Sequence, residues 1–144
     1  MGYIHFFTED TADLIKQKLP LKRWIKATIA AEGFEAGDIS IIFCSDSYLL
    51  AINKQYLQHD TYTDIVTFDN SERDDTIAGD VFISIDRVRE NALTFGVPER
   101  DELHRVVIHG ILHLCGYGDK KKKEKALMTG KEDFYLARRS LSGL

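Results

Sequence analysis

The segment from His109 to Asp119, which reads HGILHLCGYGD, constrains the fold of this chain more than any other. Its apolar positions predict a helix, on which His109 and His113 leave the same face with their Cβ atoms about 5–6 Å apart. Gly116 is expected to end this helix, because glycine readily adopts the left-handed conformation that follows a helix C-terminus. The chain can then turn back and bring Asp119 close to the two imidazoles.

Two imidazoles and one carboxylate are ligands that suit a divalent metal ion. Three protein ligands leave one coordination position open for water, which is the pattern of catalytic rather than structural zinc sites. Two alternatives stay open: the histidines form ordinary hydrogen bonds near a core, and Gly110 only lets a neighbouring helix or strand approach. The glycine stop and the acid that follows it favour a metal site formed by His109, His113 and Asp119.

The residue after the first histidine argues against a peptidase. In zinc peptidases with the HExxH motif, a glutamate at this place is the general base. Here the residue is Gly110, which has no group that accepts a proton from water. Either another residue, which the sequence does not identify, is the general base, or a hydroxide on the metal attacks directly.

The composition is that of one globular domain, which we expect to span residues 1–144. Hydrophobic residues make up 44% of the chain and charged residues 29%, and a chain of this length folds without disulfide or metal staples. We interpret Cys44 and Cys115 as small core residues, with Cys115 as a metal ligand the less favoured alternative. Without a membrane-length apolar run or a signal-peptide pattern, the sequence favours a cytoplasmic protein.

Charge is distributed unevenly along the chain. Residues 1–119 carry 11 basic and 20 acidic groups, whereas residues 120–144 carry 8 basic and 3 acidic groups. An acidic body argues against a protein that coats nucleic acid. The lysines at 120–123 and 125 can still contact a phosphate beside the metal, or they can simply form a solvated helical turn.

The periodicity of apolar residues predicts an α+β fold. Strands are predicted at 3–7, 39–44, 63–68 and 79–85, and helices at 20–32, 47–56, 99–114 and 121–141, with one more helix between a cap at Asp86 and a stop at Gly96. Ser45 or Asp46 caps the helix at 47–56. The polar turn after residue 69 makes the third and fourth strands an antiparallel pair. We expect a mixed four-stranded sheet packed with about five helices, in which a glycine turn follows the metal-binding helix.

The motifs together resemble the YbeY family of single-domain, zinc-dependent endoribonucleases, also called rRNA maturation factors. The family pattern HGxLHLxGYDH is matched at His109, Gly110, Leu112, His113, Leu114, Gly116 and Tyr117. TDIVTF at 63–68 is similar to the family strand TDVLSF, and GDVFIS at 79–84 is similar to GDIxIS. Asn53 and Tyr56 match a helix end that precedes these strands, and the resemblance covers about residues 38–135.

Three positions depart from the family pattern. Asp119 stands where the family has a third histidine ligand, and Gly118 stands where it has an aspartate. A carboxylate also binds zinc, although it admits other divalent metals more readily. Leu57 replaces a family arginine and cannot stabilise charge on a phosphate. His59 lies nearby and either takes over this role or is a bystander in an exposed loop.

The resemblance implies a single-strand-specific endoribonuclease acting in rRNA maturation and small-subunit quality control. It implies one Zn²⁺ per chain, and as partners ribosomal RNA, the small ribosomal subunit, a ribosome-associated GTPase and ribosomal proteins. Substrate contacts are expected from His59, Tyr117, Lys120, Lys121 and Lys122. Tyr117 either stacks on a base or packs back onto its helix. Thr63, Asp64, Thr67 and Phe68 either line a groove or only follow strand alternation.

Two other functions remain open at this point. The chain can be a metal-stabilised ribosome assembly factor with little or no catalysis, which Leu57 and Gly110 favour. It can also be a small hydrolase that acts on another substrate.

Overall fold

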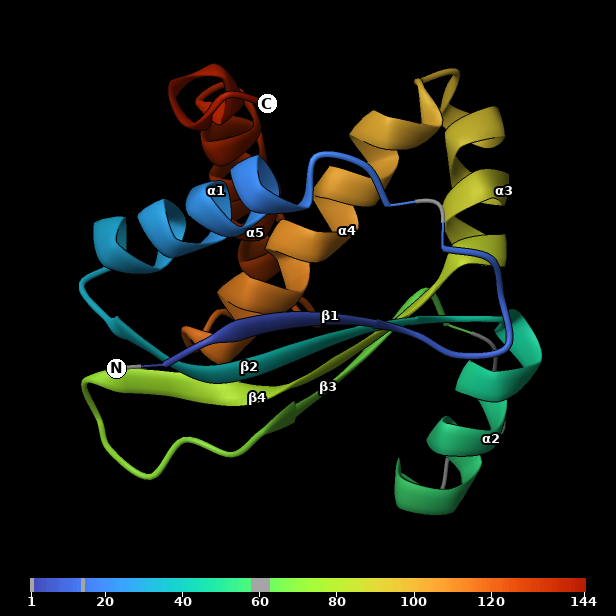
Figure 1. The fold of residues 1–144 in the computed structure, drawn as a ribbon, viewed down its shortest axis with the longest axis horizontal. Coiled ribbons are helices and arrows are strands. Elements are labelled where there is room, and N and C mark those ends of the chain that lie inside the picture. Colours follow the sequence, from blue (N-terminus) through green and yellow to red (C-terminus); the bar gives the residue numbers. More distant parts are fainter. Residues whose placement is uncertain (1, 14, 58–62) are drawn as a thin grey trace.

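The computed structural model of the chain describes residues 2–13, 15–57 and 63–144. Its centre is a sheet with the strand order β1-β2-β4-β3, formed by β1 (Ile4–Thr8), β2 (Glu35–Cys44), β4 (Thr76–Ser84) and β3 (Ile65–Asp69) (Figure 1). The first three of these pair in parallel, and β3 runs antiparallel to β4. The antiparallel pair expected from the polar turn is therefore confirmed.

Five α-helices and a short 3₁₀ helix complete the described part of the chain. They are α1 (Lys18–Ala31), α2 (Asp46–Leu57), α3 (Ile85–Phe95), α4 (Glu99–Leu114), α5 (Lys122–Leu136) and η1 (Arg139–Ser142). This mixed sheet with its helices confirms the α+β class. None of the helices within the described ranges is long and apolar enough to cross a membrane.

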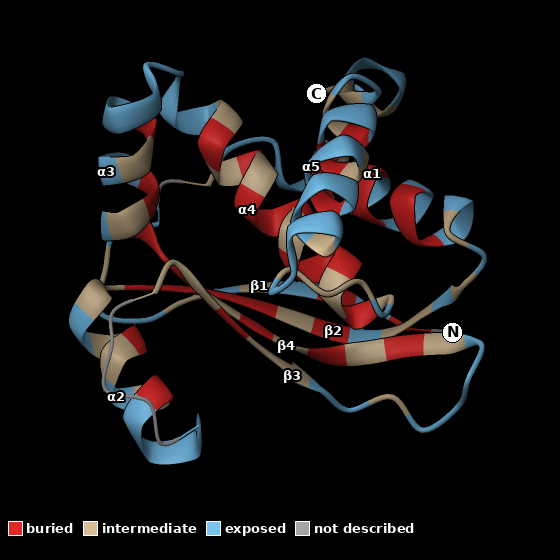
Figure 2. Cartoon of the chain, turned by 180° about the vertical axis from the view of Figure 1, so that it is seen from behind, coloured by how far each residue is buried: buried red, intermediate tan, exposed pale blue. Residues whose placement is uncertain are grey.

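The helices lie on both faces of the sheet. α1, α4 and α5 are on one face and α2 is on the other, as Figures 1 and 2 show. The main core lies beneath the three helices and includes Ile41, Val81 and Ile83 of the sheet with Ile108 and Ile111 of α4. A smaller cluster beneath α2 joins Cys44, Leu49 and Val66. Both faces of the sheet carry apolar residues. Helices must therefore cover both faces to bury these residues away from water.

α4 approaches the sheet closely at Gly110. A Cβ atom at this position would lie 2.8 Å from both Ile65 Cδ1 and Val81 Cγ1, which is closer than carbon atoms can pack. Glycine is required here for the helix to rest on β3 and β4, as the alternative interpretation of this residue expected. The close approach sets the height of His109 and His113 above the sheet.

Several element boundaries differ from the predicted ones. β2 and β4 begin earlier, because Glu35 and Ala36 pair with Thr76 and Ile77 despite their polar surroundings. The last helix ends at Leu136 instead of residue 141, and the chain continues as η1. There, a contact from Arg139 Nη1 to Asp101 Oδ1 at 2.9 Å holds the terminal segment against α4.

The predicted cap of α3 is wrong. Ser84 caps this helix by accepting a hydrogen bond from Arg87 N at 3.2 Å. Asp86 lies in the first turn, and its carboxylate accepts from Asp46 N at 2.8 Å instead. Ser45 is the residue that caps α2, since its Oγ accepts from Tyr48 N at 3.1 Å.

A buried histidine gives the fold an expected dependence on pH. His104 of α4 is 3% exposed, and burial together with the charges of Arg139 and Arg100 lowers its pKa to about 4. The unfolded chain takes up a proton near pH 6.5, so between pH 6.5 and 4 it binds more protons than the folded chain and stability falls as pH falls. We expect His104 to lower the free energy of unfolding by about 2 kcal/mol when the pH falls from 7 to 5.

Urea unfolding at the two pH values measures this difference. The His104→Leu variant is expected to lose about 2 kcal/mol less than the wild type over the same interval, because all other titrating groups are shared. An equal loss in both proteins would contradict the assignment to His104.

Candidate metal centre

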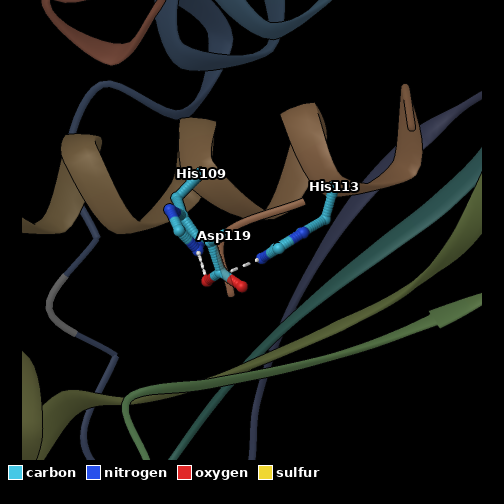
Figure 3. Close-up of side chains that lie close together, drawn as sticks. All are labelled: His109, His113 and Asp119. Atoms are coloured by element: carbon cyan, nitrogen blue, oxygen red, sulfur yellow. Dashed lines mark ion pairs between the residues drawn. The ribbon is translucent and has the colours of Figure 1, made fainter. Parts of the chain in front are cut away.

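Three ligand atoms converge beside the C-terminal half of α4 (Figure 3). Asp119 Oδ2 lies 3.2 Å from His109 Nε2 and 3.3 Å from His113 Nε2. All three atoms lie within 4.8 Å of one another, and the residues are partly buried. The fold thus brings together the three residues that the sequence predicts as ligands, and this group can hold a metal ion.

The other nitrogen of each imidazole has a hydrogen-bond acceptor. His109 Nδ1–H donates to Glu132 Oε2 at 2.6 Å, and His113 Nδ1–H donates to the Tyr117 carbonyl oxygen at 2.8 Å. These acceptors leave the Nε2 lone pairs directed toward Asp119. Metal-binding histidines are held in this way, with the non-coordinating nitrogen bonded to a carboxylate or a backbone carbonyl. The donor set of two nitrogens and one oxygen fits zinc and also related divalent ions.

A turn after α4 returns Asp119 to the helix. Gly116 has a φ of 105°, a left-handed conformation that favours glycine, and Tyr117 N donates to Leu112 O at 3.1 Å. At Gly118, a Cβ atom would lie 2.7 Å from Glu124 Oε2. The other oxygen of Glu124 accepts a hydrogen bond from Lys121 N at 3.0 Å. This gives a partner to a backbone N–H group at the start of α5. The small residue at 118 therefore leaves room for the carboxylate that caps α5.

The sequence reasoning missed two residues behind His109. Glu132 of α5 is 6% exposed, and its Oε1 atom accepts from Arg105 Nη1 at 2.8 Å while Oε2 binds His109. Arg105 Nη2 also binds Asp133 at 2.6 Å. A signal for Glu132 existed, because Met128, Glu132 and Tyr135 are spaced along the buried stripe of α5 and an acid on such a stripe needs a partner.

The charges around His109 change its titration. Burial lowers the pKa of its imidazole, but the hydrogen bond and charge of Glu132, with the charges of Asp119 and Asp64, outweigh burial and raise it. The surroundings of the site thus favour a cation at this position. A divalent ion would meet the same negative field.

A pocket of about 450 Å³ opens onto the three ligands. Thr63, Asp64 and Thr67 line it, as one of the two interpretations of this segment expected. Phe68 does not line it and packs on the other face of the sheet, where its ring meets Phe82 at 5.8 Å. Strand alternation explains the difference between Thr67 and Phe68, since residues 65 and 67 of β3 face α4 and residues 66 and 68 face α2. Thr63 and Asp64 precede β3 and reach the pocket from the segment before it.

Only some of the residues predicted to contact substrate line the pocket of the metal site. Lys120 lines the pocket, while Lys121 and Lys122 are exposed at the start of α5. Leu57 also forms part of the wall. His59 lies outside the described residues.

Tyr117 has its ring turned to a second network. Its hydroxyl donates to Glu32 Oε1, and the same carboxylate accepts from Tyr135 and from Lys131 Nζ. Burial raises the pKa of Glu32, and the three hydrogen bonds reverse this and lower it overall. The network joins the end of α1 to α5 and to the turn that carries Asp119. Tyr117 therefore packs within the protein, but it contacts the end of α1 and α5, whereas the interpretation from the sequence placed it back on its own helix. Stacking on a base stays a prediction.

Cys115 does not join the ligand group. Its thiol is partly buried against the core, and burial raises its pKa to about 12. Cys44 is fully buried, and burial likewise raises its pKa to about 12. Neither thiol is a ready metal ligand, because a thiolate is the form that binds metal.

Comparisons with known proteins agree with the geometry. The endoribonuclease YbeY family matches residues 5–140. The chain is 49% identical over 136 residues to the endoribonuclease YbeY of Cytophaga hutchinsonii, covering 94% of this chain and 95% of the relative. It is 50% identical over 134 residues to that of Parabacteroides distasonis, covering 93% and 94%.

A solved structure shares the architecture. The solution structure of a protein from Thermotoga maritima matches with a TM-score of 0.68 and 28% identity, covering 95% of this chain and 89% of the other. Together, the family match, the identity to these relatives and the shared architecture show that the chain belongs to the endoribonuclease YbeY family.

Proposed function

We propose that this chain is an endoribonuclease that hydrolyses phosphodiester bonds in single-stranded RNA with the help of one zinc ion. His109, His113 and Asp119 would hold the ion. The observation that carries the proposal is the convergence of their three ligand atoms on a pocket, with both Nδ1 atoms already bonded to acceptors. The names of the relatives, endoribonuclease YbeY, supply the reaction class.

The biological setting follows from the same resemblance. We propose that the chain, as a single domain in the cytoplasm, acts in rRNA maturation and quality control of the small ribosomal subunit. Its partners would be ribosomal RNA, the subunit itself, ribosomal proteins and a ribosome-associated GTPase.

The residues of the pocket suggest a division of labour. When bound, a zinc ion supplies a Lewis acid that polarises the phosphodiester and makes water more acidic. Burial raises the pKa of Asp64, and although His109 opposes this, the charges of Asp119 and Glu132 add to it. Asp64 therefore holds a proton more readily than an ordinary aspartate, and in the pocket wall it is placed to take one up. Lys120 would contact a phosphate, which compensates for the uncharged Leu57.

An RNA cleavage assay tests the proposal. The zinc-loaded protein is expected to cut single-stranded RNA and to leave a duplex of the same sequence intact, and a chelator should stop cleavage until zinc is restored. Lys120→Gln should weaken RNA binding and reduce its dependence on salt, since one phosphate contact is lost. A folded, zinc-loaded protein that binds RNA or the small subunit without cutting would instead support the assembly-factor function.

A further inference from the structure

A second cavity lies among α1, α3 and α4, in a part of the molecule that the proposed nuclease site does not use. Its volume is about 280 Å³, and no described residue lines both this cavity and the metal pocket. Among the described residues, five aliphatic side chains line it: Ile15, Leu21, Ile85, Val88 and Leu103. Its polar wall on α4 ends at His104, five residues before His109, or about 7.5 Å along the helix axis.

His104 presents an unused hydrogen-bond donor in this wall. Its Nδ1 atom lies 2.8 Å from Arg139 Nη1. A guanidinium can only donate, so Nδ1 is the acceptor and the imidazole proton is on Nε2. This Nε2–H has no hydrogen-bond partner among the described residues, and none of their buried side-chain polar atoms lacks a partner, so solvent reaches this donor through the cavity. A ligand with a hydrogen-bond acceptor can take the place of the solvent at this donor.

The charged residues of the cavity carry an excess of positive charge. Glu99 is already paired with Arg89, whose Nε lies 3.1 Å from Glu99 Oε1. Within the described ranges, Arg100 binds only the neutral Gln17, at 3.1 Å, and Lys16 makes no ion pair. Arg100 precedes His104 by one helical turn, so the two donors lie on the same face of α4.

We propose that this cavity binds a small carboxylic acid with an apolar body. The carboxylate would accept hydrogen bonds from His104 Nε2–H and from the free N–H groups of Arg100. The apolar body would lie against Leu21, Ile85 and Val88. A volume of about 280 Å³ holds about nine or ten non-hydrogen atoms at ~30 Å³ each, the size of octanoate.

Titration with octanoate, followed by methyl NMR of the zinc-loaded protein, tests this site. We expect saturable shifts of the methyl groups of Leu21, Ile85, Val88 and Leu103 at millimolar or lower concentration, and none at Leu141, which is exposed elsewhere. Octylamine has the same length and the opposite charge, and it should bind at least tenfold more weakly. Shifts that do not saturate, or that include Leu141 equally, would show only surface association and overturn the proposal.

Two variants that each remove one positive charge distinguish a specific contact with the carboxylate from general electrostatic attraction of the anion to the protein. Arg100→Gln removes the cation beside His104, and it is expected to weaken octanoate binding at least fivefold. Lys26→Gln removes an equal charge from an exposed position on α1 that does not line the cavity, and it should leave binding unchanged. Both residues are exposed, so neither change threatens the fold. Equal affinities in the two variants, or equal binding of octylamine and octanoate, would refute the assignment.

Discussion

His113→Ala is expected to abolish stoichiometric zinc binding and to slow RNA cleavage by about 10³-fold or more. The variant keeps His109 and Asp119, but two ligands are too few for the open three-ligand site of a catalytic zinc. The electrostatic help that a metal gives to a transition state is worth several kcal/mol, and about 4 kcal/mol corresponds to the 10³-fold loss. Elemental analysis per chain and cleavage rates, measured for both proteins, provide the comparison.

His5→Ala is the matched control for this experiment. His5 is exposed on β1, where its ring lies 6.1 Å from those of both Tyr3 and Phe7. Its loss should change neither zinc content nor cleavage. About one zinc per chain that persists in His113→Ala would show that the ligand set is wrong. If His113→Ala lost its circular dichroism spectrum together with the metal, the ion would be structural.

The ligand set could be predicted because its geometry is local. His109, His113 and Asp119 fall within one helix and the turn that ends it, so helical spacing and one left-handed glycine decide where their side chains lie. The antiparallel β3–β4 pair was predictable for a similar reason, since a short polar segment joins the two strands. No long-range packing had to be known for either inference.

The surroundings of the ligands depend on packing that periodicity does not encode. Glu132 reaches His109 across 23 residues, and Arg105 reaches Glu132 across 27. Both contacts exist only because α5 docks on α4. The misplaced cap of α3 has the same origin: Ser84 and Asp86 are both good caps in isolation, and the contact of Asp86 with Asp46, 40 residues away, decides between them.

The clearest consequence of this long-range packing concerns Glu132. Glu132→Gln is expected to weaken zinc affinity by about 10- to 100-fold while the protein stays folded. The carboxylate accepts from both His109 Nδ1–H and Arg105 Nη1. The isosteric amide has a single acceptor oxygen, so it would place its N–H groups against one of these two donors. The His109 imidazole then loses both orientation and electron density at Nε2. Competition for zinc with a chromophoric chelator gives the affinities.

Asp133→Asn separates the bond to His109 from the general effect of the charge network. Asp133 neighbours Glu132 on α5 and binds the same Arg105 at 2.6 Å, but it makes no hydrogen bond to His109. Its zinc affinity should stay within about twofold of the wild type. Saturating zinc should restore cleavage in Glu132→Gln to near the wild-type rate, because Glu132 binds the Nδ1 side of His109 and does not line the pocket. Equal losses in the two variants would assign the effect to Arg105, and a rate deficit that zinc cannot restore would give Glu132 a direct part in the chemistry.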